Sequence, residues 1–423
     1  MRNYMPRIAD TLLQEHLDAK GAVLIEGPKW CGKTTTAKQL AKSVIEMDHA
    51  EKSQQYKEMA QINPSLLLQG DVPHLIDEWQ LAKTLWNAVR YEVDQRDEFG
   101  QFILTGSAVP AKYDETMHTG TGRISRLKMR PMSLFESKES TGEVSLAALF
   151  HGDKAEAICQ DTLDKIAFCI CRGGWPKAVG KTERVALKQA YDYYDAVVSD
   201  DVSRVDEVKK DPERTKRLMH SYARHIGTQA SLEVIREDVK FSETDTFSQN
   251  TLYSYLGALN RIHLIEDVPA WNPNLRSKTA IRSSVTRYFT DPSIGAAALG
   301  VGPKDLINDL NTMGFYFENL CIRDLRVYAD LLDGSVYHYR DKNGLECDAV
   351  IHLRNGTYGL IEVKLGGDNL IAEGVRNLLE LTGKIDPLKM KKPAFAMVLT
   401  GVSPFAYQRG DGVYVVPIGC LGP

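Results

Sequence analysis

Three charged residues near the C-terminus have the types and the spacing of a metal site. The stretch LECDAVIHLRNGTYGLIEVKLG holds two apolar, strand-like runs joined by a turn-like RNGTYG. Asp348 lies on the first run, and Glu362 and Lys364 lie on the second. Alternate residues of a strand point to the same side, so Glu362 and Lys364 share one face. Two acids that converge from adjacent strands can bind Mg²⁺ or Mn²⁺, which lowers the pKa of bound water, and a lysine beside them can assist.

A further acid precedes this hairpin. Glu318 lies in FYFENL, on a stretch of amphipathic helical spacing, and we expect it to join Asp348 and Glu362 as a metal ligand. The order of helix Glu, strand Asp and strand ExK resembles nucleases of the PD-(D/E)xK type, archaeal junction resolvases among them. That resemblance implies that Glu362 and Lys364 are catalytic. The alternative is an inactive fold whose acids and lysine form an ion-pair network, because burying them unpaired would be costly.

A second constellation lies near the N-terminus. GPKWCGKTTT matches the phosphate-binding pattern G-x-x-x-x-G-K-[ST] between a strand-like run and a helix-like run. Backbone N–H groups of such a loop curl around phosphates, and the helix N-terminus adds partial positive charge. We expect Lys33 to neutralise the β- and γ-phosphates and the Thr34 hydroxyl to ligate Mg²⁺. The residues expected to contact ATP or ADP here are Gly27, Pro28, Gly32, Lys33, Thr34 and Thr35.

A phosphate loop needs a second acid for its metal, and HLIDEW supplies one. Asp77 ends an apolar run, where it can hold Mg²⁺ through water. Glu78 follows directly and can polarise the attacking water as a catalytic base. The adjacent pair of acids therefore favours hydrolysis of ATP over storage of a nucleotide.

Two more segments could act on the γ-phosphate. ILTGSA places Thr105 and Ser107 at the end of a third strand-like run, where a hydroxyl can sense the phosphate or orient water. A plain strand-ending turn is the alternative. GTGRISRLKMRPMSLFE then carries the basic residues Arg123, Arg126, Lys128 and Arg130. We expect Arg123 to act as an arginine finger, in cis or on a neighbouring subunit, with a solvated basic loop as the alternative.

The elements that position these residues fall into three parts. Residues 20–135 alternate strand-like and helix-like runs, with a helix expected over KTTTAKQLAKSVI, which predicts a parallel sheet covered by helices. Residues 155–300 are mostly helical and end in a pattern that suits a winged helix. From residue 310 a second α/β pattern follows. We expect an ATPase core over 1–150, a helical lid over 151–225, a winged-helix-like domain over 226–305 and a nuclease-like domain over 306–423.

Length and composition limit the classes of protein. A chain of 423 residues, 43% hydrophobic and 26% charged, has the composition of an ordinary soluble protein. The net charge of −4 means that any surface for nucleic acid must be local. No apolar signal core and no run of about 18 apolar residues is present. The seven cysteines are scattered and form no paired CxxC motifs. We therefore expect a cytoplasmic protein with reduced thiols and no membrane partner.

These motifs together resemble a large family of prokaryotic AAA-type ATP-binding proteins, in which a P-loop ATPase domain is joined to a C-terminal domain of unknown function. The motifs that carry the resemblance follow one another in the family's order: GPKWCGKTTT, HLIDEW, ILTGSA, RLKMRPMSLFE, RGGWPKAV, YYDAVVSDDVSRV, FYFENLCIRDL and YHYRDKNGLECDAVI. The resemblance implies an α/β fold with an AAA-type parallel sheet, a helical or winged-helix middle and a restriction-endonuclease-like α/β end.

RGGWP also resembles the Gly-x-Pro element of signal-transducing ATPases. That resemblance implies that Pro176 packs on the adenine and reports the nucleotide state to the helical domain, whereas a plain helix-breaking turn is the alternative. We find no asparagine at the strand-end sensor position and no second sensor arginine, which counts against a hexameric ring motor.

Two functions from different classes fit these observations. The first is an Mg²⁺-dependent ATPase whose C-terminal domain binds and cleaves DNA, an interpretation favoured by the basic stretches and the winged-helix pattern. The second is a nucleotide-dependent switch that binds a protein partner or assembles into an oligomer, with the nuclease-like domain acting only as an interaction module. The mildly acidic net charge favours the second.

Overall fold

The computed structural model describes residues 4–106, 120–204, 210–240, 247–273 and 284–423. The chain forms two compact units. The first consists of Met1–Pro131 with the short later segments Asp200–Lys209 and Leu256–His263. The second consists of Met132–Ser199, Lys210–Tyr255 and Leu264–Pro423.

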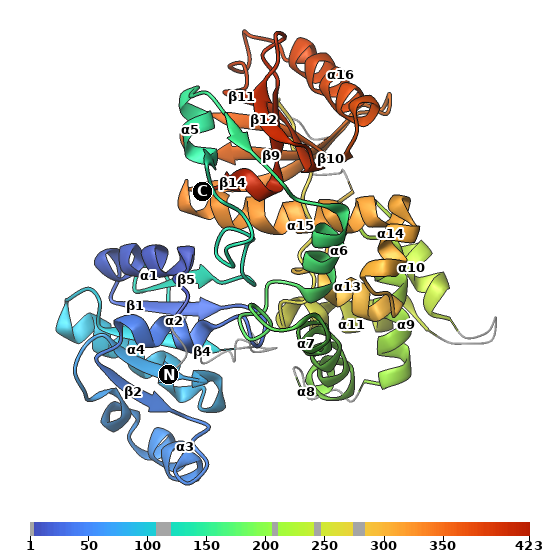
Figure 1. Ribbon diagram of the computed structural model, residues 1–423. Coiled ribbons are helices and arrows are strands. Elements are labelled where there is room, and N and C mark those ends of the chain that lie inside the picture. Colours follow the sequence, from blue (N-terminus) through green and yellow to red (C-terminus); the bar gives the residue numbers. More distant parts are fainter. Residues whose placement is uncertain (1–3, 107–119, 205–209, 241–246, 274–283) are drawn as a thin grey trace. The chain divides into compact units, whose positions relative to one another are not determined.

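The first unit is built on a parallel sheet with the strand order β2-β3-β4-β1-β5, the blue and cyan part of Figure 1. Every pair of neighbouring strands is parallel. The strands are β1 (Ala22–Glu26), β2 (Ser43–Glu46), β3 (His74–Asp77), β4 (Phe102–Gly106) and β5 (Ile124–Lys128). Because β4 lies between β1 and β3, the loop after β1 and the end of β3 are one strand apart at the same edge of the sheet.

Helices cover both faces of this sheet, as the sequence predicted. They are α1 (Ile8–Ala19), α2 (Lys33–Leu40), α3 (Ser53–Ile62) and α4 (Thr84–Arg96), with short 3-10 helices at Pro64–Leu68 and Trp79–Leu81. On one face, Leu24 and Leu104 pack with Val89 of α4. The alternate strand residues, such as Val23 and Ile103, point to the opposite face, where α1 and α2 pack on β1. Strands buried on both faces explain the continuous apolar runs.

The helix expected over KTTTAKQLAKSVI is shorter than predicted. α2 ends at Leu40, and Ala41 has an extended backbone. The Lys42 amide then donates to the Pro73 carbonyl at 2.9 Å, and β2 pairs with β3 in parallel register. Pairing with a neighbour far away in sequence therefore overrides the helical spacing of this segment.

The second unit contains a mixed sheet with the strand order β7-β12-β13-β11-β10-β9-β8. β10 is parallel to β11 and antiparallel to β9. The strands are β7 (Ala157–Ile158), β8 (Gly334–Arg340), β9 (Glu346–Leu353), β10 (Tyr358–Gly366), β11 (Phe395–Val402), β12 (Phe405–Gln408) and β13 (Tyr414–Pro417). A separate parallel pair joins β6 (Val144–Ser145) to β14 (Leu421–Gly422).

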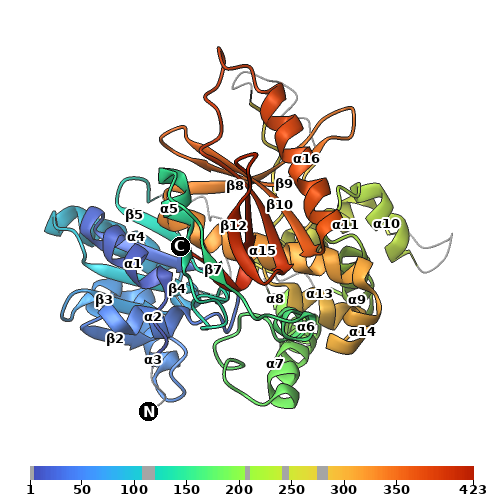
Figure 2. The ribbon, with the colours of Figure 1, turned by 45° about the horizontal axis from the view of Figure 1, so that its top comes forward.

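Two long helices cover this mixed sheet on opposite faces (Figure 2). α16 (Asp368–Lys384) packs through Val375 and Leu378 on Leu360 and Val398. α15 (Leu310–Leu331) lies on the other face, where a Cβ added to Gly401 would lie 3.3 Å from the Phe317 ring. The C-terminal part is therefore an α/β domain, in agreement with the predicted fold class.

Residues 132–161 lie in the second unit, although our predicted ATPase core extends to residue 150. The pairing of β6 with β14 and of β7 with β12 explains this difference, because both partner strands are near the C-terminus. The proposed division into four domains stays a prediction.

The remaining helices occupy the middle of the chain and its connections: α5 (Leu146–His151), α6 (Leu163–Arg172), α7 (Glu183–Ala196), α8 (Val202–Arg204), α9 (Pro212–Arg224), α10 (Leu232–Val239), α11 (Gln249–Arg261), α13 (Pro292–Leu299) and α14 (Pro303–Asn308). Antiparallel bridges join Ile265 to Phe289 and Val268 to Thr286, where a wing was expected. The winged helix stays a prediction, because α11 is divided between the two units. Among the described residues, no helix is long and apolar enough to cross a membrane.

Candidate nucleotide site and C-terminal carboxylate cluster

The phosphate loop connects β1 to α2 at the carboxyl edge of the parallel sheet. Gly32 has a φ of 108°, a left-handed conformation that favours glycine. A side chain on Gly27 would collide with the carbonyl oxygen of Met129. Lys33 is buried, and its Nζ donates to the carbonyl oxygens of Gly27 and Pro28 at 2.9 and 2.8 Å. The lysine is therefore held over the loop at the start of α2, where backbone amides and the helix terminus attract phosphate.

Asp77 brings the end of β3 to this loop. Its Oδ1 accepts a hydrogen bond from Thr34 Oγ1 at 2.9 Å and another from Thr105 Oγ1. The side chain of Asp77 is buried, so the carboxylate is held in one position. A threonine hydroxyl beside a carboxylate is a set of hard oxygen donors that fits Mg²⁺. Thr35, one residue further along α2, is exposed.

Glu78 follows Asp77 in a strained conformation. Its φ of 54° lies in the left-handed region, which is uncommon for a residue with a side chain. Burial raises the pKa of Glu78, and a hydrogen bond from Gln80 Nε2 opposes that rise. The side-chain oxygen of Gln80, Oε1, is buried and has no hydrogen-bond partner among the described residues. A carboxylate whose pKa is raised is a stronger base, as a group that takes a proton from water must be.

Arg7 is a residue of this site that the sequence did not reveal. Its guanidinium is buried and donates to the Cys31 carbonyl at 2.7 Å and to the Arg130 carbonyl at 2.8 Å. These two bonds tie the phosphate loop to the segment that leaves β5. The Tyr4 hydroxyl, three residues earlier, lies 2.9 Å from Thr36 Oγ1 on α2. A single arginine near the start of a chain has no recognisable pattern, so only the fold discloses its role.

The structure places Arg123 away from the phosphate loop. β1 and β5 are parallel, with Ala22 paired to Ile124 and Glu26 paired to Lys128. Arg123 therefore lies at the amino end of β5, whereas the phosphate loop follows the carboxyl end of β1. Its side chain is exposed and forms an ion pair with Asp94 at 2.7 Å. This position does not support a finger in cis, and the role of Arg123 as an arginine finger, in cis or on a neighbouring subunit, stays a prediction.

The other basic residues of that run differ in position. Arg126 Nη1 forms an ion pair with Glu26 Oε1 at 2.6 Å, on the strand that leads into the phosphate loop. Lys128 lies at the carboxyl end of β5. Arg130 is buried just beyond it, and its carbonyl is the one that Arg7 binds. The backbone of Arg130 therefore lies at the edge of the sheet that carries the phosphate loop.

Three further residues were predicted to contact the nucleotide, and they lie in different parts of the chain. Thr105 lies at the end of β4 and bonds to Asp77, as described above, whereas Ser107 lies outside the described residues. Pro176 is in the second unit, next to Trp175, whose ring lies 4.3 Å from that of Tyr193. The Gly174 amide donates to Asp291 Oδ2 at 2.9 Å. The contact of Pro176 with adenine stays a prediction.

The C-terminal hairpin brings two acids, Asp348 and Glu362, close to Lys364. β9 and β10 pair as far as Ala349 and Ile361. Beyond that point a side chain accepts the next hydrogen bond from β10. The Val363 N–H donates to Oδ2 of the Asp348 carboxylate at 2.7 Å. Lys364 Nζ lies 3.2 Å from Glu362 Oε2 and 3.8 Å from an oxygen of Glu373 on α16. Lys364 therefore forms ion pairs with Glu362 and Glu373, whereas the full network of the alternative interpretation stays a prediction.

Burial raises the pKa of the three acids Glu318, Asp348 and Glu362. It raises the pKa of Glu362 to about 8, with the Asp348 charge as the next cause. Burial also raises the pKa of Asp348 and, strongly, that of Glu318. Glu318 accepts a hydrogen bond from the Tyr288 hydroxyl. Glu362 Oε1 is buried and finds no hydrogen-bond partner among the described residues. Nearby acids with raised pKa values are typical of functional sites, although structural networks also produce them.

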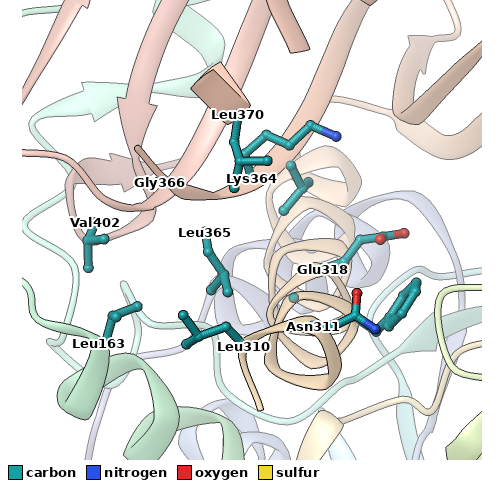
Figure 3. Close-up of a pocket in the computed structure, with 12 residues that line it drawn as sticks. Leu163, Leu310, Asn311, Glu318, Lys364, Leu365, Gly366, Leu370 and Val402 are labelled. Carbon is teal, nitrogen blue, oxygen red and sulfur yellow. The ribbon is translucent and has the colours of Figure 1, made fainter. Parts of the chain in front are cut away.

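Two pockets of the second unit meet at Glu318. The larger, about 600 Å³, is lined mostly by apolar side chains and reaches Lys364. In Figure 3, Glu318 and Lys364 carry their charged ends toward one side of this pocket, and Leu163, Leu310 and Leu365 lie toward the other. The smaller pocket, about 200 Å³, reaches Asp348. Glu318 on α15 therefore lines both pockets.

The predicted metal ligands of this hairpin do not form a ready metal site. Within the described ranges, no three His, Cys, Asp or Glu side chains gather closely enough to hold a metal ion. Glu318, Asp348 and Glu362 have the oxygen donors that Mg²⁺ or Mn²⁺ prefers, but Lys364 occupies one side of Glu362. The oxygen of Glu362 that remains for a metal is Oε1, because Lys364 pairs with Oε2.

Comparison with known families agrees with the geometry of the first unit. Residues 19–138 match the model of the AAA domain, a range that holds the phosphate loop, Asp77 and the parallel sheet. The protein is therefore an AAA-type P-loop ATPase.

Two further matches complete the chain. Residues 313–421 match a domain of unknown function (DUF4143), so this is an AAA-type ATPase joined to that C-terminal domain, as the sequence predicted. Residues 163–305 match another domain of unknown function (DUF8612). No curated protein matches the chain. Among solved structures, the Walker-type ATPase PABY2304 of Pyrococcus abyssi is similar at 14% identity, with a TM-score of 0.42, over 70% of this chain and 96% of that one.

Proposed function

We propose that the first unit hydrolyses ATP with Mg²⁺, using Lys33, Thr34, Asp77 and Glu78. The observation that supports this most directly is the hydrogen bond of 2.9 Å between Thr34 Oγ1 and Asp77 Oδ1, which joins the two expected metal-holding residues. Both are oxygen donors at the edge of the sheet where the phosphate loop lies. When bound, Mg²⁺ would neutralise charge on the β- and γ-phosphates.

The residues of the chain supply the rest of the reaction. The loop amides and Lys33 hold the phosphates, and the burial of Lys33 strengthens its interaction with them. Glu78, with its raised pKa, takes the proton from the attacking water. Thr105 fixes the Asp77 carboxylate from the neighbouring strand. Arg7 keeps the loop in place through the Cys31 carbonyl.

Replacement of the loop lysine tests this proposal. Lys33→Ala should lower the rate of ATP hydrolysis by at least about 100-fold, because charge stabilisation of this kind is worth that much. Lys38→Ala is the matched control, since Lys38 lies on the same helix but is exposed and pairs with Glu46. A Lys33→Ala protein that hydrolyses ATP at the rate of the control would refute the proposed role.

We further propose that the second unit binds DNA and cleaves it with Mg²⁺ or Mn²⁺ at Glu318, Asp348, Glu362 and Lys364. The unpartnered, buried oxygen Glu362 Oε1 supports this candidate, because a buried carboxylate oxygen usually has a ligand. The ion pair between Lys364 and Glu362 supports the competing candidate, a switch that binds a protein partner through an inactive domain. A cytoplasmic location fits either candidate.

An assay with DNA separates the two candidates. The protein is incubated with single-stranded, double-stranded and branched DNA, with Mg²⁺ or Mn²⁺, and with or without ATP. Cleavage that is lost in Asp348→Ala and Lys364→Ala, and kept in Lys384→Ala, would support the nuclease. Lys384 is a suitable control because it pairs on the surface with Asp341 and Glu380. Absence of both cleavage and salt-sensitive binding would exclude a role on DNA.

A further inference from the structure

Two of the cysteines lie against each other in the second unit. All seven are buried as free thiols, but only Cys159 and Cys420 are in direct thiol contact, through a hydrogen bond between their sulfurs. Cys420 Sγ also lies 3.6 Å from the Ile158 carbonyl. A Cβ placed on Gly419 would lie 3.2 Å from Cys159 Sγ. Each cysteine therefore lies next to the chain neighbour of the other, although the two are far apart in the sequence.

The backbone on both sides of the pair is fixed. The Cys159 amide donates to the Pro404 carbonyl at 2.9 Å, directly after β7 pairs with β12. Cys420 ends a short 3-10 helix, Ile418–Cys420, that leads straight into β14. The Gly419 carbonyl accepts from the Thr141 amide at 2.8 Å. Neither thiol can move far from the other while the sheet is intact.

The two thiols have different chemical characters. The Cys420 thiol and the Asp161 backbone amide donate hydrogen bonds to Cys159 Sγ, and these lower the pKa of Cys159 to about 7. By contrast, the interaction with Cys159 and burial raise the pKa of Cys420. Burial raises the pKa of Cys169 to about 11 and that of Cys171 to about 12. Since the thiolate is the reactive form, Cys159 is the nucleophile of the pair.

We propose that Cys159 and Cys420 are a peroxide-sensitive pair that closes into a reversible disulfide. The Cys159 thiolate attacks one oxygen of hydrogen peroxide, the O–O bond breaks, and hydroxide leaves, so the sulfur becomes a sulfenic acid. The Cys420 sulfur then attacks the Cys159 sulfur, the S–S bond forms, and the hydroxyl leaves as water with the Cys420 proton. Two thiols are oxidised and one peroxide is reduced to two waters. A dithiol reductant reverses the reaction by exchange.

The disulfide would join the segment around β7 to the C-terminal segment. The first segment pairs through β7 with β12 at the margin of the mixed sheet, and the C-terminal segment pairs through β14 with β6 in a separate two-stranded sheet. A cross-link that closes so long a loop restricts the unfolded chain strongly. Oxidation should therefore raise the midpoint of thermal unfolding of the second unit.

Thiol counting and peptide mapping test the proposal on the whole protein. Treatment with hydrogen peroxide should lower the number of free thiols by two, and dithiothreitol should restore them. Digestion of the oxidised protein should yield a peptide pair that links Cys159 to Cys420. In Cys420→Ser, the resolving thiol is absent, so Cys159 should remain a sulfenic acid that a dimedone probe labels.

Controls make each outcome decisive. Cys171→Ser removes a buried thiol outside the pair, and this variant should still lose two thiols on oxidation. If Cys420→Ser fails to fold, Cys159→Ala replaces it, and peptide mapping of the unsubstituted protein needs no variant. An unchanged thiol count at millimolar peroxide, or linked peptides that contain other cysteines, would overturn the proposal.

Discussion

Thr34 and Asp77 share a hydrogen bond of 2.9 Å, although one residue lies in the first turn of α2 and the other ends β3. The bond exists because β3 and β1 are parallel strands one position apart, so their carboxyl ends meet at one edge of the sheet. Thr105, on the strand between them, binds the same oxygen of Asp77. Three segments that are distant in the sequence thus converge on a single carboxylate oxygen.

This convergence predicts the effect of Asp77→Asn. An asparagine keeps the shape but loses the negative charge that would hold Mg²⁺ through water. We expect the rate of ATP hydrolysis to fall by about 10- to 100-fold at fixed Mg²⁺, as for other residues that act around a metal. Titration of the rate with Mg²⁺ should show a higher half-saturating concentration. An unchanged Mg²⁺ dependence would contradict the role of Asp77.

The raised pKa of Glu78 predicts a pH profile. The base must be a carboxylate, and burial raises the pKa of Glu78 above its ordinary value of 4.5. The rate of ATP hydrolysis should therefore fall on acidification at a pH above that value. In Glu78→Gln, the rate should fall by about 100-fold or more, and the acidic limb should disappear. ATP binding, measured with a fluorescent analogue, should persist, which separates a catalytic role from loss of the fold.

Arg7 should matter for the stability of the first unit and for ATP binding. Arg7→Ala leaves two buried carbonyl groups without their donor, and each such loss costs about 1 to 3 kcal/mol. We expect a lower urea midpoint of unfolding and a higher KM for ATP. Lys38→Ala is the control, because that exposed side chain forms a surface ion pair with Glu46 and its loss should leave both quantities nearly unchanged. Equal behaviour of the two variants would mean that the Arg7 bonds do not support the loop.

The raised pKa of Glu362 predicts how the stability of the second unit depends on pH. Its pKa is about 8 in the folded protein, above the value of 4.5 for a free glutamate. Between these values the folded state holds a proton that the unfolded state has released, so its contribution to stability falls as pH rises through this window. The loss is at most about 1.4 kcal/mol per pH unit, and Lys364 reduces it. Glu362→Gln should therefore gain stability relative to the unsubstituted protein as pH rises from 5 to about 8.

If the carboxylates hold metal, Mn²⁺ should reverse the difference in stability between Glu362→Gln and the unsubstituted protein. The ion would stabilise the ionised Glu362, so it should raise the unfolding midpoint of the unsubstituted protein near pH 8 and have no such effect on Glu362→Gln. A midpoint that Mn²⁺ leaves unchanged in both proteins would favour the ion-pair network over the nuclease.

The sequence predicts much of the first unit because its signals are local. The phosphate loop, the apolar run that ends in Asp77 and the run that ends in Thr105 all lie at the expected places on β1, β3 and β4. β2 was missed because its pairing with β3, and not its residue types, decides its conformation. The position of Arg123 could not be predicted either, since it depends on which end of β5 meets the loop.

The C-terminal hairpin was predicted as two strands, and β9 and β10 lie there. The pairing of β7 with β12 was missed, because a two-residue strand carries no periodic pattern. The same limit applies to Arg7, whose two acceptors are backbone carbonyls. Patterns in a sequence report on single elements, whereas these features arise from contacts between elements.

The pairing of β7 with β12 affects the order in which the protein can form during synthesis. Ile158 is synthesised long before its partner Phe405. The separation in sequence between Val144 and its partner Leu421 is larger still. The mixed sheet and the β6–β14 pair therefore cannot be completed until Leu421 has been synthesised, whereas every strand of the five-stranded parallel sheet lies before residue 131. Long-range pairings form slowly and leave strand edges open in the meantime. The nascent chain would thus carry a nucleotide-binding unit that is ready to fold well before the C-terminal sheet closes.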